Sequence, residues 1–429
     1  GGYAITATGT AANTITFQRN GAGANPVITA GLQVPGSNND GIFKIIGGDY
    51  ITIQDLTLQE DILGNTVTAA GVTNTMTEWG IALLFANTTN GPNNNTIQNN
   101  TVSLNRNYPN SYGIYSNLRH NATNPAGGLD LTTTNGGQNK VYSNAISNVN
   151  IPILFIGGGS GTVLAPGNDI GGASALTANT LTNWGSSTAP SGNGTFFGTT
   201  STVAGIHAAN QSAVNISWNS ITSAVGVNVG ASGLRGIYSD FIGTAPTGTF
   251  TNTISNNTIS LNSAGTTGVF EGIFQGNSVA SAAVATMTLN TTNNTITSVL
   301  TGALSASVVV GINNGFPWGV LNISNNIIKG NTSTATTAGF TGISNTAAVA
   351  TTINLNNNQL GDGGANAITF SSATNGAVLG ISNTGGAAAS AISITGNSFT
   401  KFVHTVAGTS AHTYITNSIA CASLDISNN

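Results

Sequence analysis

A short motif recurs along the chain: an alternating apolar strand closes with an asparagine, one further residue and an apolar residue. The steps between successive motif asparagines are 32–44 residues long. A unit that returns at such a period is the signature of a solenoid, because each repeat buries its apolar face only against its neighbours. The motif reads IQNNTV at 97–102, YSNAI at 142–146, ISWNSI at 216–221, ISNNTI at 254–259, TTNNTI at 291–296, ISNNII at 323–328, LNNNQL at 355–360 and ITGNSF at 394–399.

The length and composition of the repeat select the kind of solenoid. Leucine-rich repeats are shorter and carry helices, and propeller blades need a Trp-Asp signature that this chain lacks. Asn, Thr, Ser and Gly dominate the polar residues, and these are poor helix formers. We therefore predict an all-β fold, a single-stranded right-handed parallel β-helix of about ten coils. It forms one domain over 1–429, with a strand-dense start over 1–90, an irregular segment near 60–79 and repeats over 91–429.

The motif asparagines predict a ladder of stacked amides. Parallel strands of neighbouring coils lie about 4.8 Å apart, so equivalent residues stack directly. An asparagine side chain suits such a stack because it both donates and accepts hydrogen bonds and tolerates left-handed turns. The predicted ladder contains Asn100, Asn144, Asn219, Asn257, Asn294, Asn326, Asn358 and Asn397.

A second motif, a glycine followed by an apolar strand, predicts one specific contact between coils. Aligning RGIY with EGIF places Arg235 one coil away from Glu271. We expect these two residues to form a salt bridge between coils. As an exposed pair it would contribute only about 0.2–1 kcal/mol to stability.

Residues for catalysis are scarce. Glycoside hydrolysis needs two carboxyl groups that face one cleft. The only adjacent acidic pair is Glu60–Asp61, at the start of the irregular segment, and it is interpreted as a solvated loop. A zinc site would need three or four ligands. The only acidic residue near His404 and His412 in the sequence is Asp425. We predict no catalytic residue, no metal site and no cofactor, hence a protein that is not an enzyme.

The overall charge and hydropathy bear on partners. Charged residues make up 5% of the chain and the net charge is −4, without a basic patch for nucleic acid. No apolar run reaches 18 residues, so no membrane span is expected. Very few Lys and Glu beside abundant Asn and Thr favour an extracellular location.

Two alternative functions remain open. A carbohydrate-binding or carbohydrate-cleaving β-helix would expose aromatic side chains along a groove, and the candidates are Trp79, Trp184, Trp218 and Trp318. An ice-binding solenoid would carry a flat grid of threonines. The Thr-x-Thr pairs, at 6–8, 14–16, 66–68, 286–288 and 295–297, do not recur at one place in every coil.

Three stretches, 13–31, 40–58 and 80–106, resemble large secreted surface proteins of Bacteroidetes. Those proteins carry a right-handed parallel β-helix of the pectin-lyase-like type and usually a C-terminal sorting domain for type IX secretion. The resemblance implies this fold and export to the cell surface. It implies no particular activity.

The two ends of the chain suggest self-assembly. LDISNN at 424–429 matches LNISNN at 321–326 and stops within a coil, and no capping helix is evident at the start. Open strand edges recruit further strands, and a head-to-tail contact that does not close builds filaments. We expect an extracellular structural or adhesive protein, a cell-surface fibre or filament subunit. Its expected partners are a further copy of the chain and a surface polysaccharide. The assembly residues would be Tyr3, Ile5, Leu424, Ile426 and Asn428.

Overall fold

The structure, a computed structural model, divides the chain into two compact units. One unit comprises Gly1–Ser220 with Phe241–Pro246, and the other Ile221–Asp240 with Thr247–Asn429. Each unit is described by itself below. The residues that the structure describes are 2–33, 35–36, 38–69, 73–122, 130–159, 161–188, 190, 202–243, 245–276, 284–302, 306–362 and 367–429.

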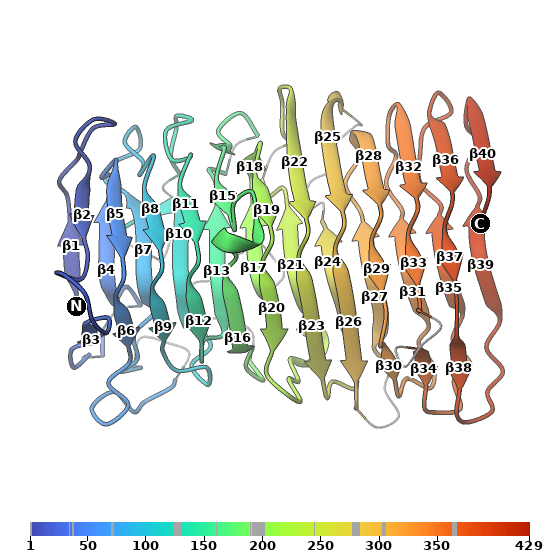
Figure 1. Ribbon diagram of the computed structural model, residues 1–429, viewed down its shortest axis with the longest axis horizontal. Coiled ribbons are helices and arrows are strands. Elements are labelled where there is room, and N and C mark those ends of the chain that lie inside the picture. The colour runs from blue at the N-terminus through green and yellow to red at the C-terminus, as the bar shows by residue number, and fades with distance from the viewer. Residues whose placement is uncertain are drawn as a thin grey trace. The chain divides into compact units, whose positions relative to one another are not determined.

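The first unit is built from three parallel sheets, A, B and C, which the chain visits in turn (Figure 1). Sheet A contains β1 (Tyr3–Ile5), β4 (Gly41–Ile46), β7 (Trp79–Phe85), β10 (Tyr112–Asn121), β13 (Ile151–Ile156) and β17 (Val203–Ala209). Sheet B contains β2 (Ile15–Phe17), β5 (Ile51–Gln54), β8 (Thr96–Gln98), β11 (Lys140–Tyr142), β15 (Asp169–Ile170) and β19 (Asn215–Ser217). Sheet C contains β3 (Val27–Thr29), β6 (Thr57–Gln59), β9 (Thr101–Ser103), β12 (Ala145–Ser147) and β16 (Thr180–Trp184). A small sheet pairs β14 (Ala165–Pro166) with β18 (Gln211–Ser212), and a 3₁₀ turn, η1, spans Ala175–Thr177.

The second unit repeats this arrangement. Its sheet A contains β21 (Leu234–Asp240), β24 (Val269–Gln275), β27 (Val308–Asn314), β31 (Phe340–Asn345), β35 (Val378–Asn383) and β39 (His412–Asn417). Sheet B contains β22 (Phe250–Ser255), β25 (Val284–Thr292), β28 (Trp318–Ser324), β32 (Thr352–Asn356), β36 (Ala391–Thr395) and β40 (Ser423–Ser427). Sheet C contains β23 (Thr258–Ser263), β26 (Thr295–Leu300), β29 (Ile327–Ile328), β33 (Gln359–Leu360) and β37 (Ser398–Phe399), extended by β30 (Thr332–Ser333), β34 (Ile368–Phe370) and β38 (Phe402–His404). The strand β20 (Ser220–Ser223) spans the boundary between the units, and a second 3₁₀ turn, η2, covers Gly230–Ser232.

The predicted fold class is confirmed, because successive coils contribute strands to each of three parallel sheets, although among the described residues the last coil has strands only in sheets A and B. The number of coils differs from the prediction. Sheet A has six strands in each unit, so the described chain forms twelve coils (6 + 6) rather than about ten. The first two coils were missed because Pro26 and Leu56 occupy the place of the motif asparagine. The segment 60–78, between β6 and β7, carries only turns and bends in its described residues.

Alternation along the short strands builds the core. Successive strand residues point to opposite faces, and the inward positions of sheet B from β5 to β19 are apolar and fully buried, whereas those of β2, on the first coil, are half-buried. Sheet C also contributes apolar, buried residues at the equivalent position of its own strands. The inward column of sheet B is Ile53, Ile97, Val141, Ile170 and Ile216, and that of sheet C is Leu58, Val102, Ile146 and Leu181.

The recurring glycine of sheet A is explained by close packing between sheets. A Cβ atom at Gly272 would lie 2.5 Å from Ile296 Cγ2 of sheet C and 2.6 Å from the carbonyl oxygen of Gly311 in the next coil. Real Cβ atoms do not approach so closely, because the core is packed to the density of a crystal. Glycine is therefore needed where sheet A passes over the isoleucines of sheet C.

Candidate functional site

The motif asparagines form a continuous hydrogen-bonded ladder within each unit. In the first unit the Nδ2 of Asn100 donates to Asn144 Oδ1 at 3.1 Å, and the ladder continues through Asn179 to Asn219. In the second unit it runs from Asn257 through Asn294, Asn326, Asn358 and Asn397 to Asn429, with Nδ2–Oδ1 distances of 2.8–3.1 Å. The same side chains donate to backbone carbonyls, such as Asn326 Nδ2 to Thr291 O at 2.8 Å. All eight predicted ladder residues are buried.

We expected the ladder asparagine itself to adopt the left-handed backbone conformation, but the residue before it does so. The residue before every ladder asparagine except Asn179 has positive φ, as at Asn256 (57°), Asn325 (59°) and Trp218 (64°), whereas Ala178 has a φ of −59°. Left-handed geometry costs an ordinary L-residue about 1–2 kcal/mol, whereas asparagine adopts it readily. This explains the Asn-Asn pairs: the first asparagine makes the turn and the second enters the ladder.

Two further ladders were missed by the sequence reasoning. In the first unit Asn95 Nδ2 donates to Asn139 Oδ1 at 3.1 Å, and Asn139 Nδ2 to Asn168 Oδ1 at 3.2 Å. In the second unit a ladder runs through sheet A, where Asn314 Nδ2 donates to Asn345 Oδ1 at 2.8 Å and Asn345 Nδ2 to Asn383 Oδ1 at 2.7 Å. The signal for the latter was present in the repeated strings GINN and GISN.

Arg235 and Glu271 face each other on β21 and β24 as predicted, with Arg235 Nε 2.5 Å from Glu271 Oε2. The guanidinium carbon also lies 4.7 Å from the centre of the Tyr238 ring and 4.5 Å from that of Phe274. Asn313 Nδ2 of the next coil donates to Glu271 Oε1 at 2.8 Å.

The expectation that this pair is exposed is wrong. The side chains of Arg235 and Glu271 are only 12% and 2% exposed. The paired rings of Tyr238 and Phe274, on the same two strands, cover the guanidinium, so the ion pair interacts in a medium that screens charges far less than water. Removing one partner of a buried pair leaves an uncompensated charge, which costs several kcal/mol.

The tryptophans do not line a groove. Trp79, Trp184 and Trp318 are at most 1% exposed, and only Trp218 is partly exposed, at the left-handed turn described above. Trp79 stacks on Tyr115 with ring centres 4.9 Å apart, and Trp318 packs edge-on against Phe316 at 4.8 Å. The predicted row of sugar-contact aromatics is therefore wrong for these three residues, because their side chains are buried.

The adjacent acids have structural roles at the start of the irregular segment. Glu60 is buried, accepting a hydrogen bond from Asn65 Nδ2 at 2.8 Å and from Thr77 N at 2.9 Å. Asp61 Oδ1 accepts the N–H of Leu63 and of Gly64, at 3.2 and 3.1 Å. The expectation of a solvated pair is wrong for Glu60, which is an internal anchor for the segment, and Asp61 is half-buried and caps the turn that follows it.

A buried carboxyl, Glu78, links three coils of the first unit. Its Oε2 accepts the N–H of Asp40 at 2.8 Å, its Oε1 is hydrogen-bonded to the hydroxyl of Tyr108, and its carbonyl accepts from Tyr112 N at 2.7 Å. Burial raises the pKa of Glu78 to about 8, against the lowering effect of these hydrogen bonds. Burial also raises the pKa of Tyr108 above its usual range.

His120 belongs to the same region. Its Nδ1 lies 2.8 Å from the carbonyl oxygen of Asn121, which can only accept, so Nδ1 carries the proton. Its Nε2 then accepts the hydroxyl proton of Tyr115 across 2.6 Å. Burial lowers the pKa of His120 to about 4, which makes this imidazole a neutral element of the core.

The other histidines gather no metal-binding set. His207 lies buried on β17, and His404 Nε2 is hydrogen-bonded to His412 Nε2 at 2.8 Å. Across the described residues, no group of three or more His, Cys, Asp or Glu side chains comes together.

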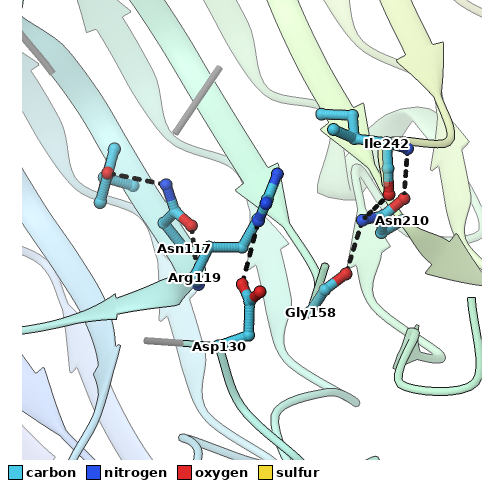
Figure 2. A network of polar contacts seen from close by, with 7 residues as sticks. Asn117, Arg119, Asp130, Gly158, Asn210 and Ile242 are labelled. Carbon is cyan, nitrogen blue, oxygen red and sulfur yellow. Dashed lines mark hydrogen bonds and ion pairs between the residues drawn. The ribbon is translucent and has the colours of Figure 1, made fainter. Parts of the chain in front are cut away.

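Polar contacts brace the loops that follow sheet A in the first unit (Figure 2). Arg119 Nε lies 3.0 Å from Asp130 Oδ1, and its backbone N–H donates to Asn117 Oδ1 at 3.0 Å. Asn210 receives the N–H of Ile242 on Oδ1 at 2.7 Å and donates to the carbonyl of Ile242 at 3.0 Å. The two hydrogen bonds between Asn210 and Ile242 tie the segment 241–246 to the first unit.

A polar cleft of about 510 Å³ lies beside the irregular segment. Its wall contains a column of outward side chains of sheet C, in which Asn148 Nδ2 donates to Ser103 Oγ at 2.8 Å and Asn183 Nδ2 to Asn148 Oδ1 at 2.6 Å. Arg106 also lines it and donates to the carbonyl of Gly185 at 2.8 Å. Several donors and acceptors of this wall are therefore already engaged in hydrogen bonds within the protein.

The residues predicted to form assembly ends differ in exposure. Tyr3 is 63%, Leu424 48% and Ile426 44% exposed, and Asn428 is exposed at a left-handed turn, but Ile5 is buried. Tyr3 borders an apolar hollow of about 490 Å³ with Phe17 and Phe43. On the last coil a hollow of about 570 Å³ is lined by residues that include Phe399, Tyr414 and Asn429.

No protein-family model matches the chain, and comparison with curated proteins and with solved structures finds no match either. Among the described residues, no helix is long and apolar enough to cross a membrane.

Proposed function

We propose that this chain is an extracellular structural or adhesive β-helix protein, of the kind found among secreted surface proteins of Bacteroidetes, and that copies stack end to end into fibres. The observation that supports the proposal is that buried polar side chains connect successive coils. Amide ladders join coil to coil within each unit, and the buried Arg235–Glu271 pair joins two coils of the second. Such a body suits a load-bearing or spacing role.

The apolar side chains exposed on the outermost coils support the assembly step. Leu424 and Ile426 would be covered by a further coil, and burying an apolar side chain is worth about 1.5–3 kcal/mol. A stacked copy would place its first coil, with Pro26 at the ladder position, over Asn429. Proline offers no side-chain acceptor, so the amide ladder would be interrupted at the junction. Apolar burial and backbone pairing would therefore hold the junction together.

The experiment is electron microscopy of the purified chain over a range of concentrations. We expect filaments whose formation is abolished by the double substitution Leu424→Lys and Ile426→Lys, because charges would be buried at the junction. The matched control is Val225→Lys, which places a lysine at an apolar residue that is 87% exposed. Isolated particles at every concentration, or equal loss of filaments in the control, would overturn the assembly.

Location is tested separately, in the cells that make the protein. Antibody should label intact cells as strongly as permeabilised ones if the chain is displayed outside. Labelling that requires permeabilisation would contradict the extracellular proposal, whatever the microscopy gives.

A further inference from the structure

The outward face of the first five strands of sheet B in the second unit is a regular, uncharged grid. On the last strand, β40, Asp425 continues its central column. Five successive strands, β22, β25, β28, β32 and β36, pair in parallel and lie side by side (Figure 1). Their central outward column is flanked by columns of threonine, serine and asparagine, with one valine and one alanine. None of these positions is charged. The central column, from strand to strand, is Thr253, Asn290, Asn322, Asn354 and Ser393.

The grid was not visible as a threonine motif. Thr286–Thr288 lies on β25 of sheet B, whereas Thr295–Thr297 lies on β26 of sheet C. The pairs therefore belong to different faces. Only the register of the coils shows that threonine, serine and asparagine alternate as one neutral hydrogen-bonding surface on sheet B.

The amides of the central column hold one another in place. Asn322 Nδ2 donates to Asn290 Oδ1 at 2.8 Å, and Asn354 Nδ2 donates to Asn322 Oδ1 at 2.7 Å. An amide has two donor hydrogens and two acceptor lone pairs. The Asn322 amide uses one donor and one acceptor along the column, so further capacity faces outward at fixed positions. Little side-chain entropy remains to be lost when this surface is covered.

The geometry identifies the kind of occupant that such a face fits. Its repeat is about 4.8 Å between strands and about 6.8 Å between alternate residues of a strand. The face is a periodic, rigid and neutral array of hydrogen-bond donors and acceptors. It is complementary to a periodic, neutral solid whose surface also presents hydrogen-bond donors and acceptors. Short side chains keep the array level. In the five central positions there is no aromatic ring on which a sugar would stack.

We propose that the sheet B face of the second unit binds ice, by holding ordered water on its central column and the threonines beside it. This is a further function, and it does not depend on fibre assembly. Waters that bridge a fixed amide or hydroxyl to the lattice are nearly as favourable as direct hydrogen bonds, and repetition over five coils adds their contributions.

The test measures the partition of the full chain into slowly growing ice, together with inhibition of ice recrystallisation. Thr288→Lys with Thr352→Lys places two long, hydrated charges in one flanking column. We expect this variant to lose ice partition to the level of a protein that does not bind ice. The matched control is Thr258→Lys with Thr295→Lys, which makes the same change at paired outward threonines of sheet C.

Circular dichroism and urea midpoints establish that both double variants are folded, and Thr352→Lys alone replaces the first if it is not. Partition of the wild type and the control, with loss in the sheet B variant, supports the proposal. Exclusion of the wild-type chain from ice overturns it. Equal behaviour of the two double variants also overturns it, because ice would then not be recognised by this face.

Discussion

Each ladder asparagine forms hydrogen bonds with residues of two neighbouring coils, and the Nδ2 atom of Asn326 is an example. Its Nδ2 donates to Asn358 Oδ1 at 3.0 Å and to Thr291 O at 2.8 Å. We expect Asn326→Asp to lower the free energy of unfolding by on the order of 3 kcal/mol, because a buried carboxylate would face acceptors. Urea unfolding measures the change. Asn375→Asp, at an exposed asparagine, is the control and should change stability little; equal losses would refute the role of the ladder.

The buried carboxyl of Glu78 predicts an unusual pH dependence. Its pKa is about 8 in the folded chain and near 4.5 when unfolded. Between these values the folded state holds a proton that the unfolded state has lost, so stability falls as pH rises from about 4.5 to 8. Glu78→Gln removes this loss. We expect the stability of the variant relative to wild type to rise by on the order of 3 kcal/mol from pH 5 to pH 8.

His120 changes the pH dependence of stability in the opposite direction, but it does not affect the comparison of wild type with Glu78→Gln. Its lowered pKa of about 4 means that stability is lost as pH falls from about 6.5 towards 4. This contribution is shared by wild type and Glu78→Gln, so it cancels in their difference. A difference in urea midpoint that stays constant from pH 5 to pH 8 would contradict the assignment of Glu78 as a neutral carboxyl.

At the scale of elements, the pairing of β21 with β24 depends on a buried ion pair. Arg235→Met leaves Glu271, 2% exposed, without its cation, and we expect a loss of about 3–5 kcal/mol. The double substitution Arg235→Met and Glu271→Leu should recover most of that loss, since neither charge is then buried. Thermal or urea unfolding of the double-mutant cycle measures both effects.

The pair Lys329–Asp362 serves as the comparison for that cycle. Its Nζ–Oδ2 distance is 3.9 Å, and its side chains are 34% and 19% exposed. Lys329→Met should therefore cost less than about 1 kcal/mol. A comparable cost for both single substitutions would mean that burial does not distinguish the two pairs.

At the scale of the whole molecule, the local stability of each strand depends on whether coils pack on both of its sides. The strand β28 is covered by β25 and β32, and its Leu321 is fully buried, whereas Leu424 of β40 is 48% exposed. In dilute preparations we expect the amides of β40 to exchange with solvent at least about 100-fold faster than those of β28, because local opening there costs less free energy. Hydrogen exchange read by mass spectrometry resolves the two strands.

Concentration distinguishes the causes of protection at β40. If copies stack, its amides should become protected as the concentration rises, while β28 stays unchanged. Equal protection of β40 and β28 at the lowest concentration would contradict the nearest-neighbour view of stability.

The sequence predicts the fold and the buried ladder well, for a physical reason. Each coil packs mainly on its neighbours, so a residue repeated at one place in the period, such as Asn294 or Asn326, must meet its own equivalent. The same logic placed Arg235 opposite Glu271. This reasoning failed at Pro26 and Leu56, where a coil lacks the asparagine. It also did not show that threonine and asparagine residues share the outward face of sheet B in the second unit.

What the sequence by itself determined is therefore whatever depends on the period: three parallel sheets, the amide ladder and the pairing of equivalent positions. Only the tertiary structure decided which side chains are covered. The burial of Trp79 and Trp318, the contact of Glu78 with Tyr108 and the enclosure of Arg235 depend on which side chains the folded coils bring together. Burial is set by packing across the coil, and no spacing along the chain encodes it.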